Sequence, residues 1–266
     1  MRHNISMFGK AILFLALSGT VTAGANAQSF LPLPDAPAPQ DTADPASATP
    51  AEAATLRNTP RNFMRDQAAI WTSPLRLTEG QAVGAVFFVA AAAGLGAEDR
   101  HIMQTHFLNP GSHINTASTG LTGLFIAAPV AFYSMGRLHN NDHARETGIL
   151  GAEAMLDSLA VDEVVKISSR RERPTADNAR GKFFQPGVGF DSSFASNHSV
   201  LAWSSAAVIA TEYNGWLTKV AAYGLATGVS MSRIVGRDHF PSDVLVGSGV
   251  GWMIGRYVVH RHRRMQ

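Results

Sequence analysis

The chain has 266 residues, of which 45% are hydrophobic and 16% charged, and its formal net charge at pH 7 is +2. This length suffices for one sizeable core or two small ones, and the low net charge argues against a nucleic-acid partner bound through charge. The sequence has no cysteine, which excludes disulfides, thiolate zinc sites and thiol catalysis and leaves the redox compartment open.

The amino-terminal residues have the layout of a secretory signal. Arg2, His3 and Lys10 precede the apolar run AILFLAL, and small residues lead up to Ala27. A basic, an apolar and a small-residue region in this order predict a signal peptide over residues 1–27, cleaved after Ala27. An uncleaved anchor is the alternative. The cleaved reading predicts a protein that is exported from the cytoplasm.

The next two segments differ in composition from the rest of the chain. Residues 28–60 are rich in Pro, Ala, Asp and Thr and have no apolar period, which predicts a disordered linker. Residues 61–80 form an amphipathic lead-in, in which Phe63, Ile70 and Trp71 stand among arginines. Two arrangements stay open for this lead-in: a helix on a membrane surface, or a helix packed on the following domain.

Residues 81–266 predict one all-α domain. Apolar stretches rich in Gly and Ala recur without strand-like alternation, which favours a bundle of about six core helices. The run GSGVGWMIG further predicts close packing between helices. The apolar stretches that we expect to be helical lie near residues 82–97, 119–135, 147–167, 197–212, 215–232 and 242–258.

The relation of this bundle to a membrane stays open. A span needs ~20 apolar residues, and several stretches are shorter or contain Glu153, Asp157 or Lys219. With a cleaved signal, six crossings would put the basic tail RYVVHRHRRMQ outside, against the positive-inside tendency. Five crossings, with 82–97 outside the bilayer, or a soluble bundle would avoid this conflict. We therefore expect a protein of the periplasm, or of the inner membrane with its active site facing the periplasm.

The stretch VVKISSRRERPT is the first that suggests chemistry. Lys166 and Arg173 are seven residues apart, so we expect both on one face of a helix that ends before Pro174. Two converging cations suit an oxyanion such as phosphate, and the arginine fork can bind two of its oxygens. The alternative is a solvated basic face. We expect residues 170–172 to form such a face or to lie behind the site.

A second group of polar residues stands where a loop leads into an apolar helix. It consists of Ser196, Asn197 and His198. Free backbone N–H groups and the positive end of the helix dipole favour an anion at such a place. A histidine there can protonate a leaving oxygen. A Ser or Asn helix cap beside an incidental histidine is the alternative.

The stretch SRIVGRDHFPSD places an arginine, a histidine and an aspartate close together. Arg233 supplies a further guanidinium. Asp243 follows His239 by four residues across Pro241, which favours the first turn of a helix, so the carboxylate can reach the imidazole. A carboxylate on one ring nitrogen leaves the other nitrogen unprotonated, which predicts a nucleophilic histidine. A structural His–Asp pair is the alternative.

Taken together, these stretches follow the order K-x6-R-P, S-x-H and S-R-x5-H-x3-D. This order resembles the type 2 phosphatidic acid phosphatase (PAP2) superfamily, which includes bacterial non-specific acid phosphatases and vanadium-dependent haloperoxidases. The resemblance covers roughly residues 145–258. It implies a phosphatase without metal or cofactor that hydrolyses phosphate monoesters, lipid phosphates or lipid diphosphates through a phosphohistidine.

The resemblance also implies a role for each matching residue. His239 corresponds to the nucleophile, Asp243 to the carboxylate that orients it, and His198 to the acid that protonates the leaving alcohol. The implied phosphate-binding residues are Lys166, Arg173, Ser196, Asn197 and Arg233.

The second motif departs from the family's usual P-S-G-H, because Ala195 and Asn197 replace the proline and the glycine. Asparagine is the least costly ordinary residue where positive φ is needed, but its side chain can crowd the phosphate. Two alternative functions stay open: a haloperoxidase in which His239 ligates vanadate, and an envelope scaffold that has lost activity. Three histidines between residues 101 and 113 lack zinc-ligand spacing, so no metal site is expected.

Overall fold

The computed structural model describes residues 54–107 and 112–265, and this part of the chain is helical without strands. The all-α prediction is therefore confirmed for these residues. The predicted signal peptide and most of the predicted linker lie outside them. The elements are α2 (Thr59–Thr72), η1 (Ser73–Arg76), α3 (Glu79–His106), α4 (Ser112–Leu138), α5 (Asp142–Ser169), η2 (Asp177–Ala179), η3 (Gly189–Asp191), α6 (Asn197–Glu212), α7 (Trp216–Val235) and α8 (Pro241–Met265).

All six predicted helices are present, and most extend beyond their predicted ends. The helix predicted at 147–167 spans Asp142–Ser169, because the side chain of Asn141 accepts the N–H of Ala144 at 3.0 Å and caps the first turn. The helix predicted at 82–97 continues through the polar residues that follow it as far as His106. The apolar stretches thus predicted where the helices lie, and polar residues at the helix ends extend them beyond those stretches.

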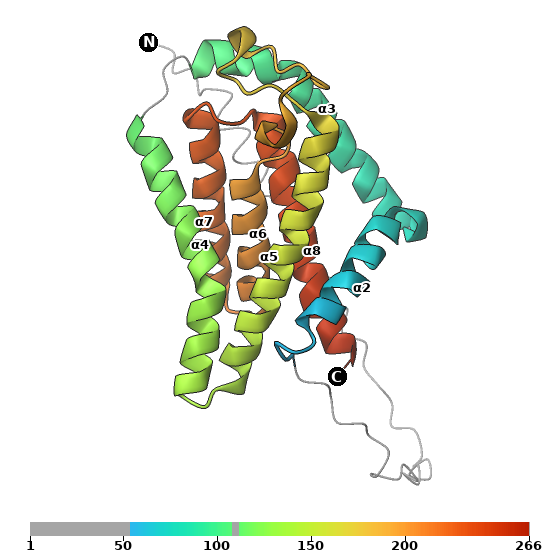
Figure 1. Ribbon diagram of the computed structural model, residues 1–266, viewed down its shortest axis with the longest axis vertical. Coiled ribbons are helices and arrows are strands. Elements are labelled where there is room, and N and C mark those ends of the chain that lie inside the picture. The colour runs from blue at the N-terminus through green and yellow to red at the C-terminus, as the bar shows by residue number, and fades with distance from the viewer. Residues whose placement is uncertain (1–53, 108–111, 266) are drawn as a thin grey trace, which may run out of the picture. The chain divides into compact units, whose positions relative to one another are not determined.

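Helix α6 is the centre of the bundle. It contacts α4, α5, α7 and α8, which run up and down around it (Figure 1). Its buried side chains are short: Val200, Ala206, Ala207 and Val208 are fully buried. Small side chains let four neighbours approach one helix closely, so the core is built around the helix that follows the second motif.

A glycine stripe on α8 forms the closest of these helix contacts. A β-carbon added at Gly251 would lie 2.3 Å from the carbonyl oxygen of Val200, and one at Gly255 would lie 2.4 Å from that of Ser204. Ordinary contacts between heavy atoms are at about 3.5 Å or more, so only glycine fits at these positions. The close packing predicted for the small-residue run is confirmed.

Helix α2 packs on the bundle through polar residues. Asp66 is fully buried and pairs with Arg261 of α8 at 2.7 Å, and Asn62 donates to Glu153 of α5 at 2.9 Å. Of the two arrangements left open for the lead-in, the packed one is therefore observed. Trp71, near the end of α2, remains exposed.

Helix α3 is apolar and yet largely exposed. Its 28 residues include two buried side chains, Asp99 and Met103. By length and composition, Glu79–His106 and Thr116–Leu138 could each cross a membrane. The segment 82–97, which one reading of the sequence left outside the bilayer, thus belongs to a helix with the composition of a span.

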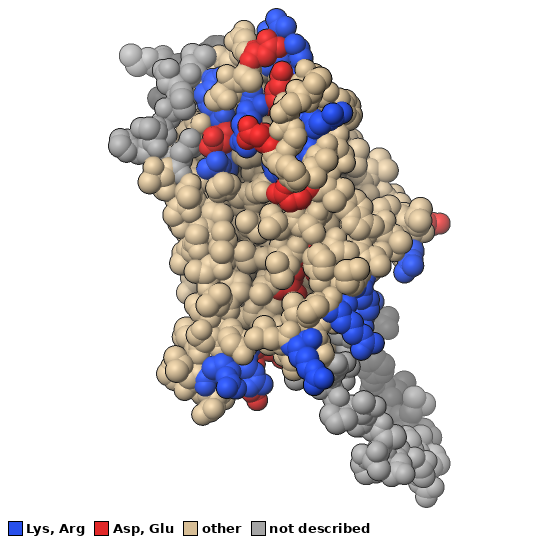
Figure 2. All heavy atoms as spheres, in the orientation of Figure 1, with Lys and Arg blue, Asp and Glu red and all other residues tan. Residues whose placement is uncertain are grey.

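On the face of the molecule drawn in Figure 2, the charged side chains lie mainly at the two ends. Figure 2 shows Lys, Arg, Asp and Glu gathered at both ends of the face in view, with few charged side chains between them. Exposed apolar side chains such as Leu124, Ile126, Leu156 and Val164 belong to α4 and α5. Apolar surface of this extent is typical of a protein that contacts lipid or another chain.

The glycine stripe leads to a prediction about stability. Gly251→Ala forces α6 and α8 apart and should lower the free energy of unfolding by about 1–3 kcal/mol. Gly228→Ala in α7 is the matched control, because nothing lies within 4 Å of a β-carbon there. Alanine should raise stability at that position by about 0.5–1 kcal/mol. Thermal unfolding of both variants measures the difference, and equal stability would contradict the packing.

Candidate active site

The first motif leaves its helix earlier than its spacing predicts. Helix α5 ends at Ser169, Arg170 adopts the left-handed conformation with φ 42°, and Arg173 lies in the following loop. The expectation that Lys166 and Arg173 share one helix face is therefore wrong, because Arg170 turns the chain. Both cations nevertheless act on one imidazole, since each lowers the pKa of His239.

Main-chain carbonyls hold the buried ammonium group of Lys166. Its Nζ donates to the carbonyl oxygens of Ser192 and Ala195, both at 2.8 Å. An ammonium group has three N–H donors, so these two bonds leave one donor for an anion. The carbonyls thus fix the position of the cation without using all of its donors.

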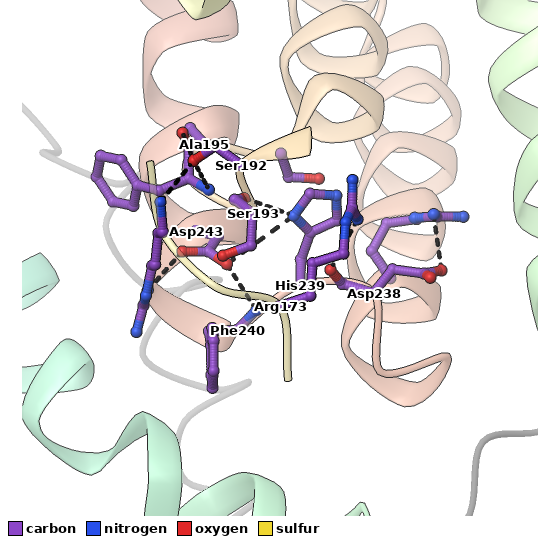
Figure 3. A network of polar contacts seen from close by, with 12 residues as sticks. Arg173, Ser192, Ser193, Ala195, Asp238, His239, Phe240 and Asp243 are labelled. Atoms are coloured by element: carbon purple, nitrogen blue, oxygen red, sulfur yellow. Dashed lines mark hydrogen bonds and ion pairs between the residues drawn. The ribbon is translucent and has the colours of Figure 1, made fainter. Parts of the chain in front are cut away.

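His239 lies in the loop between α7 and α8 and is 3% exposed. Its Nδ1 lies 2.7 Å from the carbonyl oxygen of Ser193 and 3.9 Å from Oδ2 of Asp243 (Figure 3). A carbonyl oxygen can only accept, so Nδ1 carries the ring proton and Nε2 has a free lone pair. The hydrogen-bond partner of the ring is thus a carbonyl, where the sequence predicted a carboxylate.

Asp243 closes the turn that carries His239 into α8. Its Oδ2 accepts the N–H of Phe240 at 2.8 Å, and its Oδ1 accepts Nη1 of Arg171 at 2.5 Å. Two placements were left open for residues 170–172, a surface face and a position behind the site. Arg171 has the second of these, since it is 3% exposed and binds Asp243.

The second motif begins α6. Asn197 is the first residue of α6, and its backbone does not have the positive φ considered for this position from the sequence. Its side chain donates to Glu163 of α5 at 3.0 Å. Ser196 is fully buried, and its N–H donates to the carbonyl oxygen of Asp243 at 3.3 Å. His198 follows in the first turn of α6. These bonds connect the start of α6 to both α5 and α8.

Three cations lie near enough to the two histidine rings to affect their pKa values. Burial is the main cause that lowers the pKa of His198 from 6.5 to about 4, and the charges of Arg233, Arg173 and Lys166 lower it further. Burial and the same three cations lower the pKa of His239 well below its ordinary value. Both rings are therefore neutral near pH 6–7, so the positive charge beside them comes from these three side chains.

Two aspartates orient the arginines of the site. Nη2 of Arg173 lies 2.9 Å from Oδ1 of Asp191, and Nη2 of Arg233 lies 2.7 Å from Oδ2 of Asp238. Figure 3 shows Asp238 beside the ring of His239. A guanidinium has five N–H donors, so each arginine can bind an anion while it keeps its aspartate. Neither aspartate was predicted, although Asp238 directly precedes His239 in the third motif.

The described residues contain no group of three or more His, Cys, Asp or Glu side chains that could hold a metal ion. His101 and His106 are exposed at the end of α3.

Comparison with known proteins identifies the family. Residues 147–265 match the model of the PAP2 superfamily, so the chain carries a domain of that superfamily over α5 to α8. The resemblance stated from the motifs is thereby confirmed. The matched range contains every residue to which a role was assigned.

Two relatives are similar to parts of the chain. A lipid A 1-phosphatase of Porphyromonas gingivalis is 38% identical over 66 residues, which are 24% of this chain and 15% of the relative. The match thus covers about one seventh of that curated relative. A solved structure of a transmembrane PAP2-type phosphatidylglycerolphosphate phosphatase from Bacillus subtilis is 20% identical with a TM-score of 0.48, covering 68% of this chain and 94% of that one.

The low pKa of His198 can be measured. Without ligand, its ring should titrate with a midpoint of about 4. Bound orthophosphate should raise the midpoint, because its negative charge stabilises the imidazolium. NMR of histidine-labelled protein, assigned with a His198→Gln variant, checks both values. A ligand-free midpoint near 6.5 would show that this ring is neither buried nor close to the three cations.

Proposed function

We propose that the chain is a phosphatase that hydrolyses phosphate monoesters, lipid phosphates or lipid diphosphates through a phosphohistidine. The observation that carries this proposal is the convergence of Lys166, Arg173 and Arg233 on two neutral histidines, His198 and His239. Phosphoryl transfer depends mainly on positioning and on neutralising the charge of the phosphoryl oxygens. The phosphatase named among the relatives supports the same reaction.

In the first step, Nε2 of His239 attacks phosphorus while Nδ1 keeps its proton, which stays hydrogen-bonded to the carbonyl oxygen of Ser193. A P–N bond forms and the P–O bond to the leaving group breaks. The leaving oxygen takes a proton from His198, whose ring becomes protonated as the anion binds. Lys166 and the two arginines hold the phosphoryl oxygens throughout this step.

In the second step, water attacks the phosphohistidine. His198, now neutral, accepts a proton from the water as the new P–O bond forms and the P–N bond breaks. Inorganic phosphate leaves and His239 returns to its starting state. The proposal includes no metal or cofactor, because the three cations supply the charge that neutralises the phosphoryl group.

We further propose that the weakly charged middle of the bundle lies in a lipid bilayer. Two helices have the length and composition of spans, and the exposed apolar side chains of α4 and α5 support the same placement. Helix α8 runs from the site to the opposite end of the bundle, where Arg256, Arg263 and Arg264 are exposed (Figure 1). Basic residues favour the cytoplasmic side, so the site end faces the periplasm in this proposal. With α3 as one of the spans, the residues before α3 then lie in the cytoplasm, so the proposal does not include export by the cleaved signal peptide predicted from the sequence.

Replacing the nucleophile tests the reaction. His239→Ala should lower turnover of both a soluble phosphate ester and a lipid phosphate on the order of 10⁴-fold or more. His260→Ala is the matched control, because His260 is an exposed residue near the far end of α8. Steady-state assays on membrane and soluble fractions measure the effect and locate the activity. Unchanged turnover in His239→Ala would refute the proposal, and an inactive wild type would favour a scaffold.

The role of His198 as an acid makes a separate prediction. His198→Ala should lower turnover of an alkyl phosphate about 10²–10⁴-fold, because the alkoxide then leaves without a proton. A nitrophenyl phosphate has a leaving group that needs no proton, so formation of the phosphohistidine from it should slow much less. His198 also acts in the second step, which both substrates share, so the rate of phosphohistidine formation from each substrate measures this ratio. An equal loss of that rate for both substrates would contradict proton donation by His198.

A further inference from the structure

Helix α3 contacts the site although it lies outside the range matched by the family model. The contact is made by Asp99, which is 1% exposed. Its Oδ2 accepts Nη2 of Arg171 at 2.8 Å, and its Oδ1 accepts the N–H of Ser242 at 3.0 Å. The hydroxyl of Ser242 donates to the same carboxylate. One carboxylate thus binds two groups that lie directly behind the catalytic turn.

Arg171 connects Asp99 to the active site. Its other terminal nitrogen, Nη1, donates to Oδ1 of Asp243 at 2.5 Å and to the hydroxyl of Ser242 at 2.8 Å. The guanidinium lies 4.1 Å from the centre of the Phe240 ring, and its Nε donates to the carbonyl oxygen of Gly181 at 3.2 Å. The guanidinium is planar and rigid, so fixing one edge fixes the direction of the other.

The charges in this network are costly to bury. Asp99, Arg171 and Asp243 are each at most 3% exposed, and a buried ion stabilises a protein only where its partners are well placed. Two carboxylates share one guanidinium, so neither carboxylate can move without changing the bonds of the other. The carboxylate on α3 is therefore coupled to the one beside His239.

We propose that Asp99 is a positioning residue of the active site. It holds Arg171 and the first turn of α8, and these hold Asp243 and the loop that carries His239. Helix α3 is then part of the catalytic unit. This inference rests on the phosphatase function proposed above.

The test replaces the charge and keeps the shape. Asp99→Asn should lower kcat about 10–100-fold, as is typical when a residue that orients a reactive group is changed. KM should stay within about threefold, because Asp99 does not contact the cations that bind phosphate. Glu98→Gln is the matched control: the same chemical change at the next, exposed position of α3. Its kcat and KM should equal those of the wild type.

A second variant keeps the test decisive if Asp99→Asn does not fold. Arg171→Lys retains the charge but lacks the fork that spans two carboxylates, so it should also lower kcat at least about 10-fold with little change in KM. Wild-type kcat in either folded variant, or a rise of KM alone, would overturn the inference. Failure of the phosphatase proposal is distinct, because the wild-type chain itself would then turn over no phosphate.

Discussion

The active site depends on three main-chain carbonyls in one short segment, residues 192–195. Those of Ser192 and Ala195 accept both bonds of the Lys166 ammonium group, and that of Ser193 accepts the ring proton of His239. Carbonyl oxygens cannot donate, so they determine which nitrogen of the ring is protonated and where the ammonium points. The segment therefore prepares a nucleophile and a cation together, before any substrate binds.

The helices bring the remaining groups to this segment. Helix α6 starts at Asn197, just after this segment, and carries His198 in its first turn, and Lys166 lies in the last turn of α5. The carbonyl oxygen of Asp243 in α8 accepts the N–H of Ser196. Close packing of α6 on the glycine stripe of α8 keeps these helix ends in register. Small residues in the middle of the bundle thus have a direct effect on the geometry at its end.

The apolar pattern predicted the helices well, because burial of a helical face requires apolar residues at regular spacing. The motif residues also meet in space, but their local geometry could not be read from spacing. The turn at Arg170 and the hydrogen bond to the carbonyl oxygen of Ser193 could not be predicted from residue types, because almost every residue provides the same backbone groups. Asp99, in contrast, could have been noticed in the sequence. A carboxylate near the end of an apolar helix is costly to bury unless another group binds it, so it indicates a partner.

The most direct measurement is detection of the covalent intermediate. The account predicts that protein mixed with a labelled phosphate ester and quenched in base retains phosphate on the peptide that contains His239. Acid should release this phosphate, since a P–N bond is labile in acid. An active protein that never acquires label, or that carries label on a residue other than His239, would contradict the account.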